Sequence, residues 1–194
     1  MERLKEALSA AGIAYKENEP LSAHCTFRIG GPADLFVLPE NEEQLCAAIR
    51  LAKEAGVRSY LLGNGSNILF EDAGYRGAVI NVSAMKSGIG VIENISFPGK
   101  DPALTYDAVV VGAGQMLASL CMAALENSLT GLEFAYGIPG TVGGAVYMNA
   151  GAYGGEMKDV LASVRYLTGE GEIVEAPAEQ LDLRYRHSIF EENG

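Results

Sequence analysis

The stretch FAYGIPGTVGGAVYMNAGAYGG, residues 134–155, decides how the rest of this 194-residue chain is interpreted. Its 22 residues carry no formal charge, and seven of them are Gly and one is Pro. A membrane span is excluded, because such a segment cannot keep every backbone group in the helical ladder that lipid requires. Dense Gly indicates positive φ angles, or close approach of backbone to backbone or to a ligand. We therefore interpret the stretch as a ligand-binding loop, with a turn-rich connection as the alternative.

Composition narrows the ligands and the compartment. The net charge is −11, from 14 basic and 25 acidic residues, so there is no basic stripe for nucleic acid. An anionic ligand must then be held by backbone N–H groups or by a few placed Arg and Lys. Three distant cysteines and two histidines predict neither a metal site nor a disulfide framework, and the cysteines and His24 are expected to be packing residues. The charged N-terminus lacks a signal peptide, so we expect a cytoplasmic protein without membrane association.

Apolar spacing in the first eighty residues predicts alternating helices and strands. Helices are expected at 3–11 and from Asn41, an N-cap with Gln44 as its capping-box partner, to a stop at Gly56. Strands are expected, in chain order, at 34–38, 59–62, 67–70 and 77–82. The first two strands and the helix between them form a compact βαβ unit.

The second half is less regular at first. Residues 83–106 are rich in Gly and Pro, which predicts a domain seam with a surface insert near 94–106. Later elements are expected as a buried strand at 108–111, a helix at 115–127, a hairpin of 160–168 with 172–175, and a helical turn at 177–181. The inward face of the helix is expected to carry Leu117, Leu120, Cys121, Ala124 and Leu125. The class is α+β, with two lobes at 1–82 and 83–194.

Three motifs are candidates for chemistry. The first is LGNGSN at 62–67, directly after a strand, which is no Rossmann fingerprint because position 68 is Ile. Its consecutive N–H donors can cradle a pyrophosphate, although a tight turn is the alternative. The second is the Gly-rich segment 137–155, so that two Gly-rich loops, one in each lobe, could bracket a dinucleotide. The third is RYRHS at 184–188, an anion-handling cluster or a solvated strand end, in which His187 and Ser188 point to opposite faces and form no triad.

These residues resemble the UDP-N-acetylenolpyruvoylglucosamine reductase (MurB) family of flavoenzymes. The resemblance is carried by TFRIGG at 26–31, LGNGSN at 62–67, GIPGTVGGAVYMNAGAYGG at 137–155 and YRHSIF at 185–190. The first two stretches are also similar to flavin-binding domains of the vanillyl-alcohol oxidase type. The resemblance implies two α+β subdomains that clasp FAD, followed by a substrate domain that is absent from this chain, which stops at Gly194.

The resemblance also implies which residues bind FAD. The pyrophosphate would be cradled by backbone N–H groups of Gly63, Asn64, Gly65, Ser66 and Asn67. The flavin and its ribityl-phosphate region would be covered by Gly137, Pro139, Gly140, Thr141, Gly143 and Gly144, with Asn149, Gly151 and Ala152 nearby. Binding through N–H groups explains how an acidic chain without a basic patch would hold an anionic cofactor.

In the family reaction, NADPH gives hydride to the flavin, which gives it to the enolpyruvyl ether of a UDP-sugar. By resemblance, Arg186 would stabilise the charge that develops beside the substrate carboxylate, and Tyr185 would shape the site. The proton-donating Ser of the family lies in the missing substrate domain, and Ser188 does not match it. Cys25 stands where the family commonly has Asn, and little effect is expected.

Three functions remain open from the sequence. The first is the FAD-binding part of a MurB-type oxidoreductase, expected to be monomeric. The second is a flavin-binding module without catalysis as isolated. The third is a related flavin-dependent oxidase with covalently attached flavin, for which His24, His187 and Cys25 are the few candidate attachment sites.

Overall fold

The computed structural model describes residues 1–85, 88–96, 105–169 and 171–191, and it divides into two compact units. Unit 1 is Met1–Lys86 and unit 2 is Ser87–Gly194. The sequence predicts lobes at 1–82 and 83–194 that form the two parts of one flavin site, and this stays a prediction. In the described part of the chain, no helix is long and apolar enough to cross a membrane.

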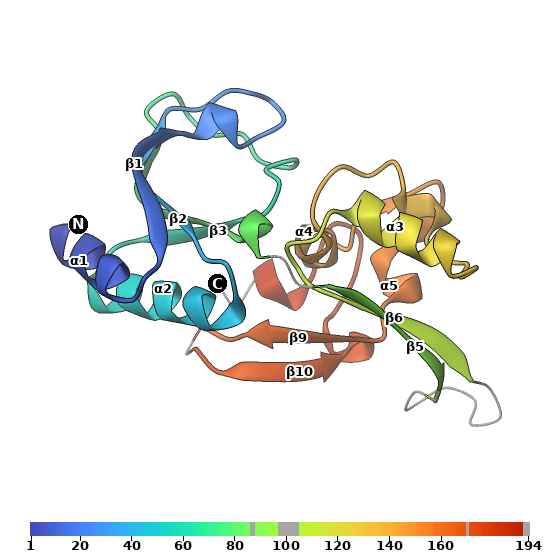
Figure 1. The fold of residues 1–194 in the computed structure, drawn as a ribbon. Helices are drawn as coiled ribbons and strands as arrows, with labels where there is room; N and C mark the ends of the chain where they lie inside the picture. The colour runs from blue at the N-terminus through green and yellow to red at the C-terminus, as the bar shows by residue number, and fades with distance from the viewer. Residues whose placement is uncertain (86–87, 97–104, 170, 192–194) are drawn as a thin grey trace. The chain divides into compact units, whose positions relative to one another are not determined.

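Unit 1 is built on a four-stranded sheet with the order β1-β2-β4-β3 (Figure 1). The strands are β1 (Ala14–Pro20), β2 (Pro32–Leu38), β3 (Ser59–Leu62) and β4 (Tyr75–Asn81). β2 and β3 both run parallel to β4, which lies between them, whereas β1 pairs antiparallel with β2. The expected βαβ unit is therefore present, but its two strands are not neighbours in the sheet.

Two helices cover one face of this sheet. In α1 (Glu2–Ala10), Leu4 and Leu8 lie one turn apart and are buried. α2 (Glu42–Glu54) begins at the predicted N-cap, because the Asn41 side chain accepts a 2.9 Å hydrogen bond from the Gln44 N–H, and Gly56 follows its end with φ +65°. The Gln44 side chain accepts from the Glu40 N–H at 2.9 Å and not from the Asn41 N–H, so the expected capping box is not formed. Both helices pack on alternate residues of the strands, in a core that contains Leu4, Leu8, Ala48, Ala52, Leu35, Val37, Ala78 and Ile80.

Loops cover the opposite face. The intervening strand residues Phe36 and Val79 point to this side, where they pack with Leu21, Cys25, Leu62 and Phe70. Leu21 belongs to a short helix, η1 (Leu21–Ala23), and the His24 ring stacks on Phe36 at a centroid distance of 4.0 Å. The strand expected at 67–70 is wrong, because that apolar run reflects loop packing rather than a ladder. This loop face carries the first candidate motif.

Unit 2 opens with an antiparallel pair, β5 (Ile89–Ile95) and β6 (Tyr106–Val111), followed by α3 (Leu117–Glu126). The strand expected at 108–111 is present as part of β6, but it is not buried, since Val110 is 58% exposed on this two-stranded ribbon. Leu125 is also not inward but 67% exposed, whereas the other four predicted helix residues are buried. Residues 97–104 of the expected insert lie outside the described residues.

The Gly-rich stretch does not form one loop. It contains η3 (Glu133–Ala135), a helix α4 (Val142–Tyr147) and the strand β7 (Gly151–Ala152), which pairs with β8 (Gly155–Glu156). Then follow α5 (Met157–Val160) and the predicted hairpin of β9 (Ser163–Leu167) and β10 (Ile173–Pro177). The helical turn predicted at 177–181 is present as η4 (Ala178–Gln180), and the described chain closes with η5 (Ile189–Glu191). α3, α4 and α5 share one core.

Candidate functional site

The loop at residues 63–67 leaves the carboxyl end of β3 beside the end of β4. The carbonyl oxygen of Gly63 accepts hydrogen bonds from Asn81 Nδ2 at 2.9 Å and from Ser83 Oγ at 3.1 Å. The two polar side chains come from the last residue of β4 and from the short helix η2 (Val82–Ala84). They fix the start of the loop at the carboxyl ends of the parallel strands, where ligands of α/β proteins commonly bind.

Gly65 could not be replaced by another residue without moving the backbone. Its φ is +63°, and an added Cβ would lie 2.1 Å from the carbonyl oxygen of His24 and 2.8 Å from Cys25 Cα. The carbonyl oxygen of Gly65 accepts a 3.0 Å hydrogen bond from the Thr26 N–H. The loop therefore lies directly on the chain that leads into the motif at 26–31.

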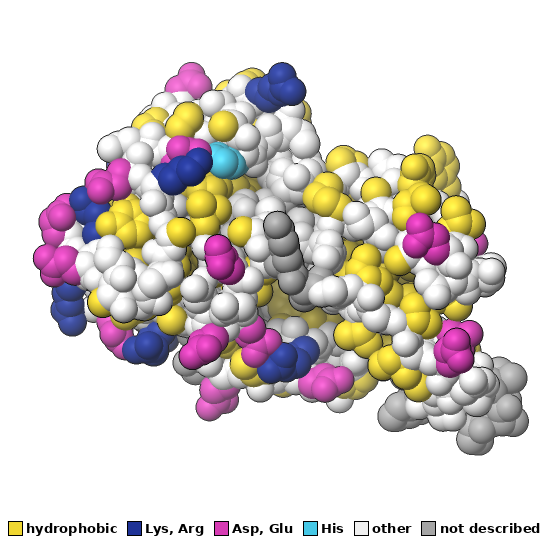
Figure 2. All heavy atoms as spheres, viewed as in Figure 1, with side chains coloured by type: hydrophobic (Ala, Val, Ile, Leu, Met, Phe, Trp, Pro, Cys, Tyr) yellow, Lys and Arg dark blue, Asp and Glu magenta, His cyan; other side chains and the backbone are white. Residues whose placement is uncertain are grey.

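A shallow depression of about 490 Å³ opens at this contact. It is lined by Ala23, His24, Cys25, Thr26, Arg28, Gly63, Asn64, Asn81 and Ser83. These lining residues include no Asp or Glu, but they do include hydroxyl, amide and guanidinium groups. The depression therefore fits an anionic group such as a pyrophosphate. On the face shown in Figure 2, acidic and basic side chains are scattered among apolar ones.

The predicted glycines of unit 2 differ in their surroundings. Gly143 lies in the first turn of α4, and an added Cβ would meet Ala113 Cβ at 2.8 Å. At Gly151 it would lie 2.6 Å from the carbonyl oxygen of Gly155, so that glycine serves the β7–β8 pair. Gly137, in contrast, has open space around its Cβ position. Among these three, Gly137 alone leaves room for a ligand, and the other two permit backbone contacts within the protein.

Thr141 starts α4, and its buried side-chain oxygen accepts from the Gly144 N–H at 3.3 Å. Thr141 thereby satisfies one of the free N–H groups of the helix N-terminus. At the other end of the segment, the buried Asn149 side chain donates to Glu156 Oε2 at 2.8 Å and to the carbonyl oxygen of Arg184 at 2.9 Å. The structure thus brings Asn149 together with the RYRHS motif, 35 residues later.

The RYRHS motif is a tight turn rather than a strand end. Arg184 and His187 exchange backbone hydrogen bonds, Arg184 N–H to His187 O at 3.2 Å and His187 N–H to Arg184 O at 3.1 Å. Tyr185 and Arg186 form the tip, where Tyr185 is 82% exposed and Arg186 has φ +54°. Ser188 is buried and donates to the carbonyl oxygen of Tyr147 at 2.6 Å. Sequence reasoning missed this turn because an Arg at positive φ gives no signal in the residue pattern.

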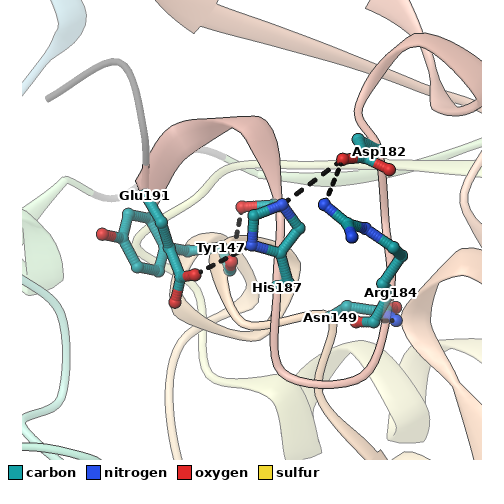
Figure 3. Close-up of polar contacts among 7 residues, drawn as sticks. Tyr147, Asn149, Asp182, Arg184, His187 and Glu191 are labelled. Carbon is teal, nitrogen blue, oxygen red and sulfur yellow. Dashed lines mark hydrogen bonds and ion pairs between the residues drawn. The ribbon is translucent and has the colours of Figure 1, made fainter.

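Charged neighbours brace the turn from one side. In Figure 3, Arg184 and His187 both point toward Asp182, at 2.6 Å and 3.4 Å, and the other nitrogen of His187 lies 3.1 Å from Glu191. Burial, with a smaller contribution from Glu191, raises the pKa of the Tyr147 phenol above its ordinary 10.0, so the phenol is neutral near pH 7. Within the described residues, no group of three or more His, Cys, Asp or Glu side chains could hold a metal ion.

The sequence is similar to known proteins over nearly its whole length. The family model described as an FAD binding domain matches residues 33–177. A UDP-N-acetylenolpyruvoylglucosamine reductase of Agathobacter rectalis is 47% identical over 94% of this chain, and one of Clostridioides difficile is 45% identical over 92%. The matches cover 57% and 55% of those relatives, so the chain spans little more than half their length.

Solved structures give the same result for the fold. The UDP-N-acetylenolpyruvylglucosamine reductase (MurB) of Thermus caldophilus has a TM-score of 0.64 and 31% identity, over 91% of this chain and 56% of that one. A vanillyl-alcohol-oxidase-type flavoprotein of Myceliophthora thermophila has a TM-score of 0.60 at 19% identity, over 75% of this chain and 26% of that one. The second likeness concerns the fold alone, and together they confirm the predicted class.

Proposed function

This chain belongs to the FAD binding domain family, and on that premise we propose that it holds the flavin of a UDP-N-acetylenolpyruvoylglucosamine reductase. The observation that carries the proposal is the loop at 63–67, packed so closely on residues 24–26 that Gly65 admits no side chain. The reductases similar to this chain, at 45–47% identity, supply the choice of reaction.

Unit 1 would hold the pyrophosphate of FAD. The N–H groups of Gly63, Asn64, Gly65, Ser66 and Asn67 are the proposed donors, at the carboxyl end of β3. Asn81 and Ser83 hold this loop through Gly63 O, and Arg28 lines the same depression. Arg28 was not among the residues expected from the sequence, and its guanidinium would add a positive charge. The absence of acidic side chains among the lining residues supports an anionic occupant.

Unit 2 would cover the flavin and its ribityl phosphate. The proposed residues are Gly137, Pro139, Gly140, Thr141, Gly143, Gly144, Gly151 and Ala152. The open space at Gly137 supports direct contact there, and the close packing of Gly143 and Gly151 supports a role in shaping the segment. Bound FAD would supply hydride exchange between NADPH and the enolpyruvyl group of a UDP-sugar.

Arg186 and Tyr185 are the proposed catalytic residues. Both lie exposed at the tip of a turn that is followed by the buried Ser188, an arrangement that leaves a guanidinium available to a carboxylate. Arg186 would stabilise the negative charge that develops next to the substrate carboxylate, and Tyr185 would shape the site around it. We further propose a cytoplasmic, monomeric protein.

Titration of the purified chain with FAD tests the proposal. We expect quenching of flavin fluorescence at about one flavin per chain, and a yellow protein after gel filtration. A folded chain that takes up no FAD would overturn it. Activity is measured in a chimaera in which this chain replaces the matching part of a full-length relative. Flavin uptake with an inactive chimaera would favour a non-catalytic flavin module, and flavin that stays attached after denaturation would favour an oxidase.

A further inference from the structure

Asn149 ends helix α4 in an arrangement for which its side chain is not needed. Its own N–H donates to Val146 O at 3.0 Å, and the next N–H, of Ala150, donates to Ala145 O at 2.8 Å. These two bonds are those of a Schellman motif, and they require the left-handed φ of +40° that Asn149 adopts. Gly is the usual residue at this position, so the Asn side chain has a separate role.

Both N–H donors of that side chain are committed to protein groups. Asn149 is 2% exposed, and its Nδ2 donates to Glu156 Oε2 at 2.8 Å and to Arg184 O at 2.9 Å. Its Oδ1 accepts from the Lys158 N–H at 2.9 Å. An amide side chain has two N–H donors, and both are used here. A hydrogen bond from this side chain to a cofactor would have to break one of these contacts.

The bond to Arg184 O reaches the base of the turn that presents Arg186. Arg184 O also accepts the His187 N–H that closes the turn. Arg186 adopts φ +54°, which an L-residue avoids and which persists when neighbouring contacts enforce it. In Figure 3, Asn149 lies beside Arg184 on the side away from the Asp182 network, so the turn is held from both sides.

We propose that Asn149 is a positioning residue, which sets the place of Arg186 through the carbonyl oxygen of Arg184 and does not bind the cofactor through its side chain. The inference rests on the proposed function, because Arg186 has a catalytic role only in that reaction. Ser188, bonded to Tyr147 O, holds the other end of the turn on α4.

Replacement Asn149→Gly isolates the side chain, since Gly keeps the helix end. In the chimaeric reductase loaded with FAD, we expect kcat to fall about 10- to 100-fold, as for a misplaced catalytic group. KM for the UDP-sugar and the Kd of FAD should change less than about twofold, because neither ligand contacts the lost amide in this proposal. In the 194-residue chain, hydrogen exchange at the His187 amide should become about tenfold faster. The matched control is Asn18→Gly, an exposed Asn at φ +51° in β1, which should change none of these quantities.

A second variant separates positioning from stability. Asn149→Asp combined with Glu156→Gln can restore a hydrogen bond between these two positions but supplies no N–H to Arg184 O. We expect its melting temperature to recover relative to Asn149→Asp alone, while kcat stays low. If Asn149→Gly does not fold, this double variant decides by the same kcat readout.

The outcomes distinguish the two proposals. Loss of FAD from Asn149→Gly, unchanged kcat, or recovery of kcat in the double variant overturns the positioning role. An inactive chimaera with the unsubstituted chain overturns the proposed function instead. In that case, hydrogen exchange at the His187 amide decides whether Asn149 holds the turn, because that measurement needs no activity.

Discussion

The hydroxyl of Ser188 donates a 2.6 Å hydrogen bond to the backbone carbonyl of Tyr147, which lies 41 residues earlier in the chain. Tyr147 is the last residue of α4, so this bond ties the end of the helix to the turn that carries Tyr185 and Arg186. Ser188 is fully buried, and removal of its hydroxyl would leave Tyr147 O without this donor.

We predict that Ser188→Ala lowers the free energy of unfolding by about 0.5–1.5 kcal/mol, the net contribution of a typical intramolecular hydrogen bond. Urea denaturation followed by circular dichroism measures it. Ser119→Ala, on the exposed face of α3, is the control and should be neutral or slightly stabilising because Ala favours helix. Equal effects of the two substitutions would contradict a role for the Ser188 bond.

Gly65→Ala should destabilise the chain more than Ala at another left-handed glycine. Gly12 and Gly56 have φ of +68° and +65° and nothing within 4 Å of an added Cβ. Their replacement by Ala should cost about 1–2 kcal/mol from the φ angle alone. Gly65→Ala adds the overlap with His24 O and should also abolish FAD uptake. Thermal unfolding and flavin fluorescence provide both readings, and equal melting temperatures for the three variants would refute the close contact.

Gly143→Ala and Gly137→Ala should separate folding from ligand contact. The first forces a Cβ against Ala113 and should cost about 1–3 kcal/mol of stability. The second meets open space in the protein and should leave the melting temperature unchanged. If the flavin lies against Gly137, the Kd of FAD should nevertheless rise in Gly137→Ala. A lost close contact of about 1.4 kcal/mol corresponds to about a tenfold rise. Unaltered FAD affinity in Gly137→Ala would remove Gly137 from the proposed cofactor site.

Arg186→Ala should lower kcat of the chimaeric reductase by about 100- to 1000-fold, the usual effect of losing one group that stabilises a developing anion. The Kd of FAD should stay within about twofold, and an equal loss of both would place Arg186 in flavin binding instead. Arg186→Gly should be as inactive as Arg186→Ala. It should nevertheless be more stable by about 1 kcal/mol, because Gly adopts φ +54° without strain.

The pH dependence of stability should report on Glu156. Its ion pair with Lys158 at 2.7 Å, and then its hydrogen bond from Asn149, hold the pKa of Glu156 below the ordinary 4.5. A group with a lowered pKa stabilises the fold above its ordinary value, and this contribution is lost as the pH falls below 4.5 through the lowered pKa. We predict that Glu156→Gln is less stable than the unsubstituted chain near neutral pH, and that the difference narrows below pH 4.5. Urea unfolding at a series of pH values tests this, and a constant difference would contradict it.

Local signals along the chain were sufficient for much of the fold. The Asn41 cap with Gln44, the stop at Gly56 and the strand at 59–62 are where residue preference and apolar period place them. The apolar run at 67–70 is not a strand, because an apolar run does not reveal whether a ladder partner is present. The run at 108–111 is a strand but is not buried, because the same residue types also occur on an exposed two-stranded ribbon. Leu125 was misjudged for a related reason: helical spacing gives a face but not the width that a neighbour covers.

The sequence by itself determined the α+β class, the family and the two Gly-rich segments, since these depend on residue types at short spacing. Only the tertiary structure decided what each glycine does. Gly65 and Gly143 are required by atoms of residues 24 and 113, and Gly137 faces open space, although all three read alike in the chain. Likewise, the bond from Asn149 to Arg184 joins positions 35 residues apart. Such contacts depend on how packed elements bring distant backbone groups together, which no local pattern of residues encodes.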